Sequence, residues 1–360
     1  MRGPALLALL LAACGGAGAG APDAAPTADA GPPPRALTVT AGLGAGGVSA
    51  PVIFTVPDGT RSLTVIAAGA PEALFALATL TTADGVEHTG LDPAGGYGAE
   101  MRASYQDEQI GQMPGALYQS VRLGTFTHVF PYRPDQALPA GPTELRVASD
   151  AAGGDVTVTL LMPADDGAGV LHLDVIGVAD AFTLTAPLPW QDELAAIFAP
   201  AGLDVVIDQV LARPGTGFDA ITDFHEPQEP PDGLSAQLAR LGPSLAGGGR
   251  ALRVFVVEAL PAGVGGLSLG TPGPPDPDSY YYGVLVRRAA SDAEMARVVA
   301  HEVAHFLALQ HVANLGLSGM VYPDPLDDTQ TGQGNLMESG TTLTPDQAYS
   351  LSRSALLAAD

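Results

Sequence analysis

The stretch His301-Glu302-Val303-Ala304-His305 constrains this chain more than any other feature of its sequence. It lies in a segment with a helical pattern, because Ser291 and Glu294 have the spacing of a capping box and apolar residues recur downstream at helical intervals. On a helix, side chains four residues apart lie one turn apart on the same face. Two imidazoles placed in this way can bind one zinc ion, and Glu302 beside them can reach a water molecule on the metal. We therefore expect a helix from about residue 291 that carries a metal site.

Strand and helix patterns alternate around this helix, from about residue 168 onward. Strands are predicted at Val170–Ile176, Leu203–Ile207, Leu252–Val257 and Tyr280–Val286, and helices at Trp190–Ala201, ended by Gly202, and at Leu234–Leu241. A Gly/Pro-rich loop is predicted over residues 262–277. Such alternation favours an α/β-type or α+β domain, which we expect over residues 168–360.

Residues 36–165 have a different pattern, with short alternating apolar runs between Gly, Pro and Asp. Strands are predicted at Ala36–Thr40, Val52–Val56, Ser62–Ile66, Leu145–Ala148 and Val156–Leu160. This pattern predicts an all-β module, a sandwich or jelly roll. His88 and His128 stand alone here, and we interpret them as structural. The sequence leaves open whether the module binds substrate, acts as a spacer or assists folding.

The N-terminus has the features of an export signal. Arg2 precedes the apolar run Ala5–Ala13, which is shorter than the roughly 20 residues that a membrane-spanning helix needs. The run ends in Leu11-Ala12-Ala13-Cys14, which resembles the bacterial lipobox, and Cys14 is the only cysteine. We expect residues 1–14 to be a lipoprotein signal peptide with the lipid on Cys14. The alternative is an ordinary signal peptide with an incidental cysteine.

Residues 15–35 consist mostly of Ala, Gly and Pro, with no hydrophobic period. This composition predicts a flexible, extended tether between the lipid and the folded part. We therefore expect an exported lipoprotein of the bacterial cell envelope, at the outer membrane or cell surface. Its contact with the membrane would be through the N-terminal anchor alone.

The charge balance narrows the range of partners. The chain has 39 acidic residues and 15 basic ones, all of them arginine, and a formal net charge of −24. Such a balance argues against nucleic acid and anionic lipid surfaces as partners. It is compatible with solubility on a crowded cell surface and, as an alternative, with a preference for basic substrates.

The segment His301–His311, which reads HEVAHFLALQH, resembles the metzincin signature HExxHxxGxxH. Further along, Asp328-Thr329, Asn335-Leu336-Met337 and the opening Thr344-x-x-Gln347 of the last predicted helix are similar to the pappalysin branch and related bacterial secreted proteases. The resemblance covers about residues 168–357 and is strongest over 291–347.

This resemblance implies a metzincin-like α+β catalytic domain that follows the all-β module. It also implies a zinc site in which His301, His305 and His311 are the ligands, Glu302 is the general base and Met337 lies in a tight turn beneath the metal.

One residue departs from the family pattern, because Ala308 stands where metzincins have glycine. That glycine usually takes a positive φ, which alanine adopts at a cost of about 1 kcal/mol. If the helix simply continued, His311 would lie about 120° around the axis from His305 and could not share its metal. We expect the helix to end near Ala308, so that His311 completes the site. Otherwise the third ligand would have to come from another group: Glu338, Asp324, Asp327 or Asp328.

Other acidic residues suggest weaker features. Asp276–Asp278 and Asp324–Asp328 offer oxygen ligands for a possible Ca²⁺ ion, but they lack the EF-hand pattern, and solvated loops are the alternative. Asp328 and Asn335 are candidates to orient the zinc ligands through hydrogen bonds.

The expected activity is zinc-dependent hydrolysis of peptide bonds within protein or peptide substrates. The substrate would lie extended along an edge strand, near residues 262–277. One alternative is a surface binding protein or adhesin whose β-rich module is the working part, although an intact Glu302 argues against a degenerate enzyme site. The other is a zinc hydrolase that acts on a non-peptide amide.

Overall fold

The computed structural model describes residues 35–89, 101–102, 123–164, 169–178, 184, 186–213, 251–261, 263–315 and 321–359. All of them belong to one compact unit, Gly31–Asp360. The expected signal peptide with Cys14, the tether up to residue 34 and the predicted helix Leu234–Leu241 lie outside the described residues. No helix among the described residues is long and apolar enough to cross a membrane.

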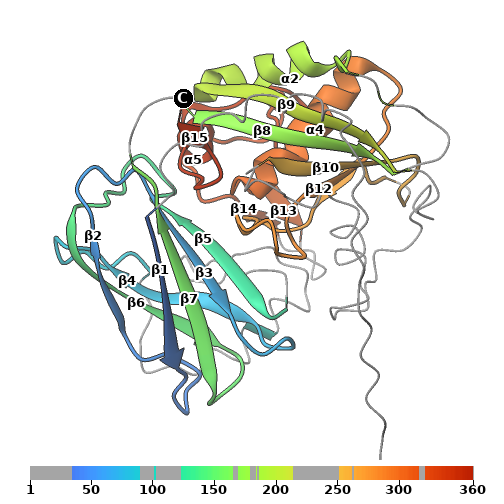
Figure 1. Ribbon diagram of the computed structural model, residues 1–360. Helices are drawn as coiled ribbons and strands as arrows, with labels where there is room; N and C mark the ends of the chain where they lie inside the picture. Colours follow the sequence, from blue (N-terminus) through green and yellow to red (C-terminus); the bar gives the residue numbers. More distant parts are fainter. Residues whose placement is uncertain are drawn as a thin grey trace, which may run out of the picture. The chain divides into compact units, whose positions relative to one another are not determined.

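Two antiparallel sheets form from the first part of the chain (Figure 1). One has the order β1-β7-β3-β5, with β1 at Arg35–Gly42, β7 at Asp155–Met162, β3 at Leu63–Ala68 and β5 at Thr125–Phe130. The other has the order β2-β6-β4, with β2 at Val52–Val56, β6 at Gly141–Ser149 and β4 at Phe75–Thr81.

The alternating sequence explains why these strands pack as they do. Along β2, the side chains of Val52, Phe54 and Val56 are buried while those between them are exposed. Successive side chains of a strand point to opposite faces, so one apolar face is available for packing. Apolar side chains of both sheets meet in a single hydrophobic cluster, for example Phe54 from one and Phe126 from the other. The five strands predicted here are all present, some of them longer than predicted.

The second part of the chain forms a mixed sheet with the order β11-β12-β10-β8-β15, and β9 also pairs with β8. The strands are β11 (Gly266–Ser268), β12 (Val284–Arg287), β10 (Leu252–Val257), β8 (Gly169–Gly177), β9 (Leu203–Ala212) and β15 (Ala358–Ala359). Strands β12, β10, β8 and β9 are parallel, whereas β11 and β15 pair antiparallel with their neighbours. The short strand β11 therefore lies at one edge of this sheet.

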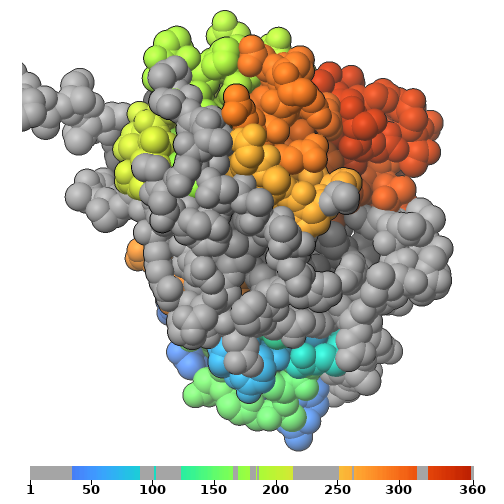
Figure 2. Space-filling model, turned by 90° about the vertical axis from the view of Figure 1, so that its right-hand side faces the viewer, coloured from blue at the N-terminus to red at the C-terminus, as the bar shows by residue number. Residues whose placement is uncertain are grey.

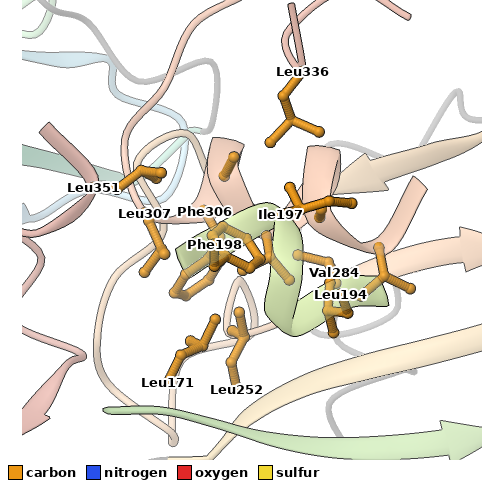
Figure 3. Packing of buried hydrophobic residues seen from close by; sticks show 14 of the residues in the cluster. Leu171, Leu194, Ile197, Phe198, Leu252, Val284, Phe306, Leu307, Leu336 and Leu351 are labelled. Atoms are coloured by element: carbon orange, nitrogen blue, oxygen red, sulfur yellow. The ribbon is translucent and has the colours of Figure 1, made fainter. Parts of the chain in front are cut away.

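Helix α4 (Asp292–Phe306) begins where the capping signal predicts, and the Ser291 hydroxyl accepts a hydrogen bond of 3.2 Å from the Glu294 N–H. Helix α2 (Gln191–Phe198) packs beside it, and the two are seen as adjoining green and orange residues in Figure 2. Figure 3 shows Phe198 of α2 and Phe306 of α4 together with Leu171 of the sheet. This hydrophobic contact fixes α4 against the sheet.

A short 3-10 helix, η1 (Ala199–Ala201), directly follows α2, and three further short elements complete the described fold. Strands β13 (Ala313–Leu315) and β14 (Val321–Pro323) pair with each other, and helix α5 is Pro345–Leu351. Helix α5 begins with a capping box made by Thr344 and Gln347, as the Thr-x-x-Gln pattern suggests.

Some predicted elements differ from the structure, and the strand predicted at Leu203–Ile207 extends to Ala212. The strand predicted at Tyr280–Val286 begins only at Val284, because Gly283 has a φ of 145° and ends the preceding turn. The loop predicted over 262–277 contains the edge strand β11. Overall the described chain is β-rich, with several sheets and few helices, consistent with the α+β and all-β expectations for its two parts.

Hydrogen bonds connect the first part of the chain to its last residues. Arg61 Nη2 donates to the carbonyl oxygens of Ser354 at 3.3 Å and of Leu357 at 3.4 Å. Ser350 Oγ donates to the carbonyl oxygen of Tyr132 at 2.5 Å.

Candidate metal centre

Helix α4 carries His301, Glu302 and His305 in its last two turns. His305 and Glu302 are each 6% exposed, and His301 is half-buried. The two histidine rings lie edge to face, with centroids 4.8 Å apart, because four residues of helix bring them onto one face.

The helix ends at Phe306, and the chain then turns back at Ala308. Ala308 has a φ of 121° and is the only non-glycine residue with a positive φ in the described part of the chain. The backbone leaves the helix there, as predicted, and His311 returns to the other two histidines. Its Nε2 atom lies 3.1 Å from His301 Nε2 and 3.0 Å from His305 Nε2.

Two backbone carbonyls determine which nitrogen of each helical histidine faces the centre. His301 Nδ1 lies 2.6 Å from the Leu336 oxygen, and His305 Nδ1 lies 2.7 Å from the Leu309 oxygen. A carbonyl oxygen only accepts, so each Nδ1 must carry the proton. The Nε2 atoms of His301 and His305 are therefore unprotonated, and their lone pairs point toward the same space.

This arrangement fits a bound cation. The ligand atoms of His301, His305 and His311 all lie within 4.8 Å of one another, and no other such group occurs among the described residues. Zinc–nitrogen bonds of about 2.0–2.1 Å in a tetrahedral site separate the nitrogens by about 3.3 Å, close to the spacings seen here. Without a cation, the unprotonated Nε2 atoms of His301 and His305 would both lie at hydrogen-bond distance from His311 Nε2. That atom carries at most one proton, so it could donate to only one of them. The ligand types and their spacing fit zinc.

Burial favours the neutral form of the histidines, which is the form that binds metals. It lowers the pKa of His301 to about 4 and that of His305 well below its usual value. Burial raises the pKa of Glu302 to about 8, while a hydrogen bond from the Ser268 backbone and the charge of Arg297 act in the opposite direction. A cation held by the three histidines would also favour the charged carboxylate.

Glu302 lies directly against the edge strand. A Cβ atom added to Gly266 would come within 2.5 Å of Glu302 Cγ and 2.8 Å of the Leu285 oxygen. Only glycine leaves enough room for the carboxylate here. The sequence showed a Gly-rich segment, but not which glycine approaches Glu302.

Met337 lies in the tight turn that the resemblance implies and is fully buried. Asn335 holds this turn, since its side chain accepts from the Met337 N–H at 2.8 Å and donates to Gln347 Oε1 at 2.8 Å. The Leu336 carbonyl between them accepts from His301. Asn335 therefore acts on the histidine through the backbone of the turn.

Three of the other acidic candidates accept hydrogen bonds from nearby residues. The carboxylate of Asp328 accepts from Thr344 Oγ1 at 2.7 Å and from the Asp346 N–H at 2.9 Å, at the start of α5. Asp324 accepts from the Thr329 hydroxyl, and Asp276 Oδ1 accepts from the Asp278 N–H at 3.0 Å. These contacts cap helices and turns, and they give no support to a calcium site.

A cleft opens at the three histidines and Glu302. The loop and edge strand from Gly263 to Ser268 line one side, and Arg297 and Glu338 also line the cleft. Glu338 Oε2 accepts from the Gly332 N–H at 2.9 Å. Neither Arg297 nor the orienting carbonyls of Leu309 and Leu336 were candidates from sequence. Arg297 precedes His301 by four residues, a spacing that places both on one face of a helix and could have indicated that the arginine lies near the site.

Comparisons with known proteins add little to this geometry. A scan against protein-family models and a search among curated proteins both returned no match. Similar solved structures include archaemetzincin from Methanopyrus kandleri, at 12% identity and a TM-score of 0.28, over 51% of this chain and 87% of that one. Metalloproteinase-II from Bacteroides fragilis aligns at 10% identity and a TM-score of 0.30, over 54% of this chain and 61% of that one.

A family two carbohydrate esterase from Clostridium thermocellum also aligns, at 13% identity and a TM-score of 0.17, over 61% of this chain and 60% of that one. TM-scores this low are not evidence for a shared fold or activity.

Proposed function

We propose that this chain is a zinc-dependent endopeptidase of the metzincin type. The observation that carries the proposal is the convergence of three imidazole nitrogens, two of them unprotonated, beside the buried carboxylate of Glu302 in an open cleft. Three protein ligands leave a zinc ion one open position, which is the pattern of a catalytic site.

When bound, zinc supplies a Lewis acid that polarises the scissile carbonyl and makes a neighbouring water more acidic. Glu302 would accept a proton from the attacking water and then deliver it to the leaving amine. The Ser268 N–H donates to the Glu302 carboxylate, and Gly266 packs against its stem, so both hold it in place for this transfer.

The edge strand β11 provides a place for the substrate backbone. One side of β11 pairs with β12. On its other side, no strand among the described residues pairs with it. An extended peptide can add to such an edge through main-chain hydrogen bonds. Glu302 lies directly beside Gly266 of this strand, so a peptide there would pass the carboxylate.

Glu302→Gln tests the proposal directly. It should keep zinc and lose about 100-fold or more of the rate on a peptide library, the scale of general-base catalysis. Glu338→Gln is the matched control in the same cleft and should keep both zinc and activity. Loss of zinc in Glu302→Gln would make Glu302 a ligand. A wild type that binds zinc but cleaves no peptide would remove the peptidase proposal and favour a non-peptide amide.

We also propose that the protein is exported and anchored by lipid on Cys14. The short apolar run that ends in Leu11-Ala12-Ala13-Cys14 supports this proposal. In cell fractionation the wild type should stay with the membrane and Cys14→Ser should be released. A wild type found free in the medium would contradict the anchor.

We further propose two domains, an all-β sandwich or jelly roll over 36–165 and a metzincin-like domain over 168–360. Their largely separate hydrophobic clusters support this division. Val129 and Tyr132, however, contribute to the cluster of the second part. Expression of residues 166–360 alone should give a folded, zinc-binding protein, and a molten product would show that the two parts share a core.

A further inference from the structure

The cleft contains one cation whose role the proposed function leaves open. Arg297 lies on α4 one turn before His301 and two turns before His305, so the three side chains share a face of the helix. Its side chain lines the same cleft as His301, His305 and Glu302.

Arg297 has no hydrogen bond or ion pair among the described residues. By contrast, four other arginines (Arg102, Arg133, Arg146 and Arg288) each pair with a carboxylate. The nearest candidate on its own helix, Glu294, is three residues away and does not pair with it. Arg287 on β12 likewise has no side-chain partner among the described residues, so what distinguishes Arg297 is its place in the cleft beside the histidines and Glu302.

We propose that Arg297 determines specificity by binding a carboxylate of the substrate, on the C-terminal side of the scissile bond. This inference rests on the proposed peptidase function. The carboxylate is either an acidic side chain or the free C-terminus of a short peptide, since a guanidinium binds both in the same bidentate way.

The direction of the edge strand places this subsite. Gly265, just before β11, lies beside Val298, and Gly266 at the start of β11 lies beside Glu302, so the chain enters this strand from the N-terminal side of Glu302 on α4. An antiparallel peptide on β11, the slightly more stable pairing, would run the opposite way. Its C-terminal half would then extend from the histidines toward Arg297.

The distance limits which substrate residue is read. Four residues of helix advance about 6 Å between Arg297 and His301, and an extended peptide advances about 3.3 Å per residue. The guanidinium therefore faces the first or second residue after the scissile bond. Its local charge opposes the basic-substrate preference that the net charge of −24 suggests.

The first test is cleavage of an internally quenched peptide library by the zinc-loaded protein, followed by matched peptides. These carry Glu, Gln or Lys at the first or second position after the cleaved bond and have an amidated C-terminus. A parallel set ends at those positions as free acid or amide. The wild type should prefer Glu over Gln, or the free acid over the amide, by about tenfold or more in kcat/KM, and the preference should fall with added salt.

Arg297→Gln should abolish this ratio, Arg297→Glu should reverse it toward Lys, and Arg297→Lys should restore part of it. Arg35→Gln on β1 removes the same charge far along the chain and should leave the ratio as in the wild type. Zinc content should be equal in all variants. An unchanged ratio in Arg297→Gln, or an acidic preference confined to the N-terminal side, would overturn the proposal.

A binding measurement separates this inference from the proposed function. In zinc-loaded Glu302→Gln, fluorescence anisotropy should show Glu peptides binding about tenfold more tightly than Gln peptides, and Arg297→Gln in that background should remove the difference. If peptides bind tightly through their carboxylate but the wild type cleaves none, the role of Arg297 in carboxylate binding would stand and the peptidase proposal would be rejected. If the wild type cleaves peptides without any carboxylate preference, the peptidase proposal would stand and the role of Arg297 would be rejected.

Discussion

The two parts of the chain each bury a histidine almost completely, yet only one of the two belongs to a candidate site. His128 on β5 is 5% exposed and stacks on Phe126, with ring planes 5° apart. His305 on α4 is 6% exposed, but its Nδ1 faces a carbonyl and its Nε2 faces His311. Burial lowers the pKa of both residues, to about 4 for His128.

The comparison shows that burial and a lowered pKa do not by themselves identify a metal ligand. Convergence makes the difference, because the unprotonated nitrogens of His301 and His305 point at the same space from one helix face. His128 is one of a series of inward-facing residues on its strand and adds to the packing of a sheet.

Loss of one converging nitrogen should have the largest effect. His311→Ala removes one of three ligands and should weaken zinc binding by well over 100-fold, since even the outer partners of zinc ligands contribute 10–100-fold. Activity should be lost with the metal. Zinc content after dialysis, measured by mass spectrometry, tests this prediction.

His172→Ala is the control for that experiment, because His172 is also a histidine of the second part but pairs with Asp208. It should keep zinc. Full zinc occupancy in His311→Ala would show that His311 is not a ligand. The third ligand would then have to be Glu338 or one of the aspartates at 324–328.

Much of this site could be predicted from the sequence because its determinants are local. The His301–His305 spacing, the capping box at Ser291 and the position of Ala308 all act within a few residues. The same holds for the strands at Val52–Val56 and Leu252–Val257, where short apolar runs determine the structure.

The remaining features depend on residues far apart in the chain. Nothing near His301 indicates that the Leu336 carbonyl, 35 residues away, orients its ring. The close approach of Gly266 to Glu302 likewise arises from the packing of β11 against α4. The strand predicted from Tyr280 failed because Gly283 has a backbone conformation that composition does not reveal.

Gly266→Ala tests how far the second part depends on such a contact. The new Cβ would displace the Glu302 side chain, so activity should fall toward the 100-fold loss expected for Glu302→Gln while zinc is retained. Overpacking should also destabilise the fold by about 1–3 kcal/mol. Gly265→Ala is the matched neighbour, since its Cβ would lie 3.5 Å from Val298, and it should be tolerated. Equal activities of the two variants would show that Glu302 is not held by this strand.

His128 gives a pH dependence that involves no metal. Its pKa is about 4 in the folded state and about 6.5 when unfolded, so the unfolded chain binds more protons between these values. Stability should therefore fall as pH drops below 6.5, by about 1.4 kcal/mol per unit and about 3 kcal/mol in total. Urea unfolding of wild type and His128→Phe should show a difference that is constant above pH 7 and moves in favour of the variant below 6.5. A pH-independent difference would mean that His128 is protonated in the fold.

The smallest expected effect is at Ala308, where a non-glycine residue holds a φ of 121°. Ala308→Gly removes this strain, but it also loses a buried methyl group worth about 0.8 kcal/mol and gains entropy in the unfolded chain. These two losses offset most of the roughly 1–2 kcal/mol of strain that is relieved, so the net change should lie within about 1 kcal/mol of zero, with zinc binding retained. Ala296→Gly is the matched control, because Ala296 is equally buried but helical, and it should destabilise by about 2 kcal/mol from lost helix propensity and packing. Urea unfolding of both variants measures the difference. Equal destabilisation of the two would show that the backbone at 308 prefers the helix, and the return of His311 to the other histidines would then lack its structural basis.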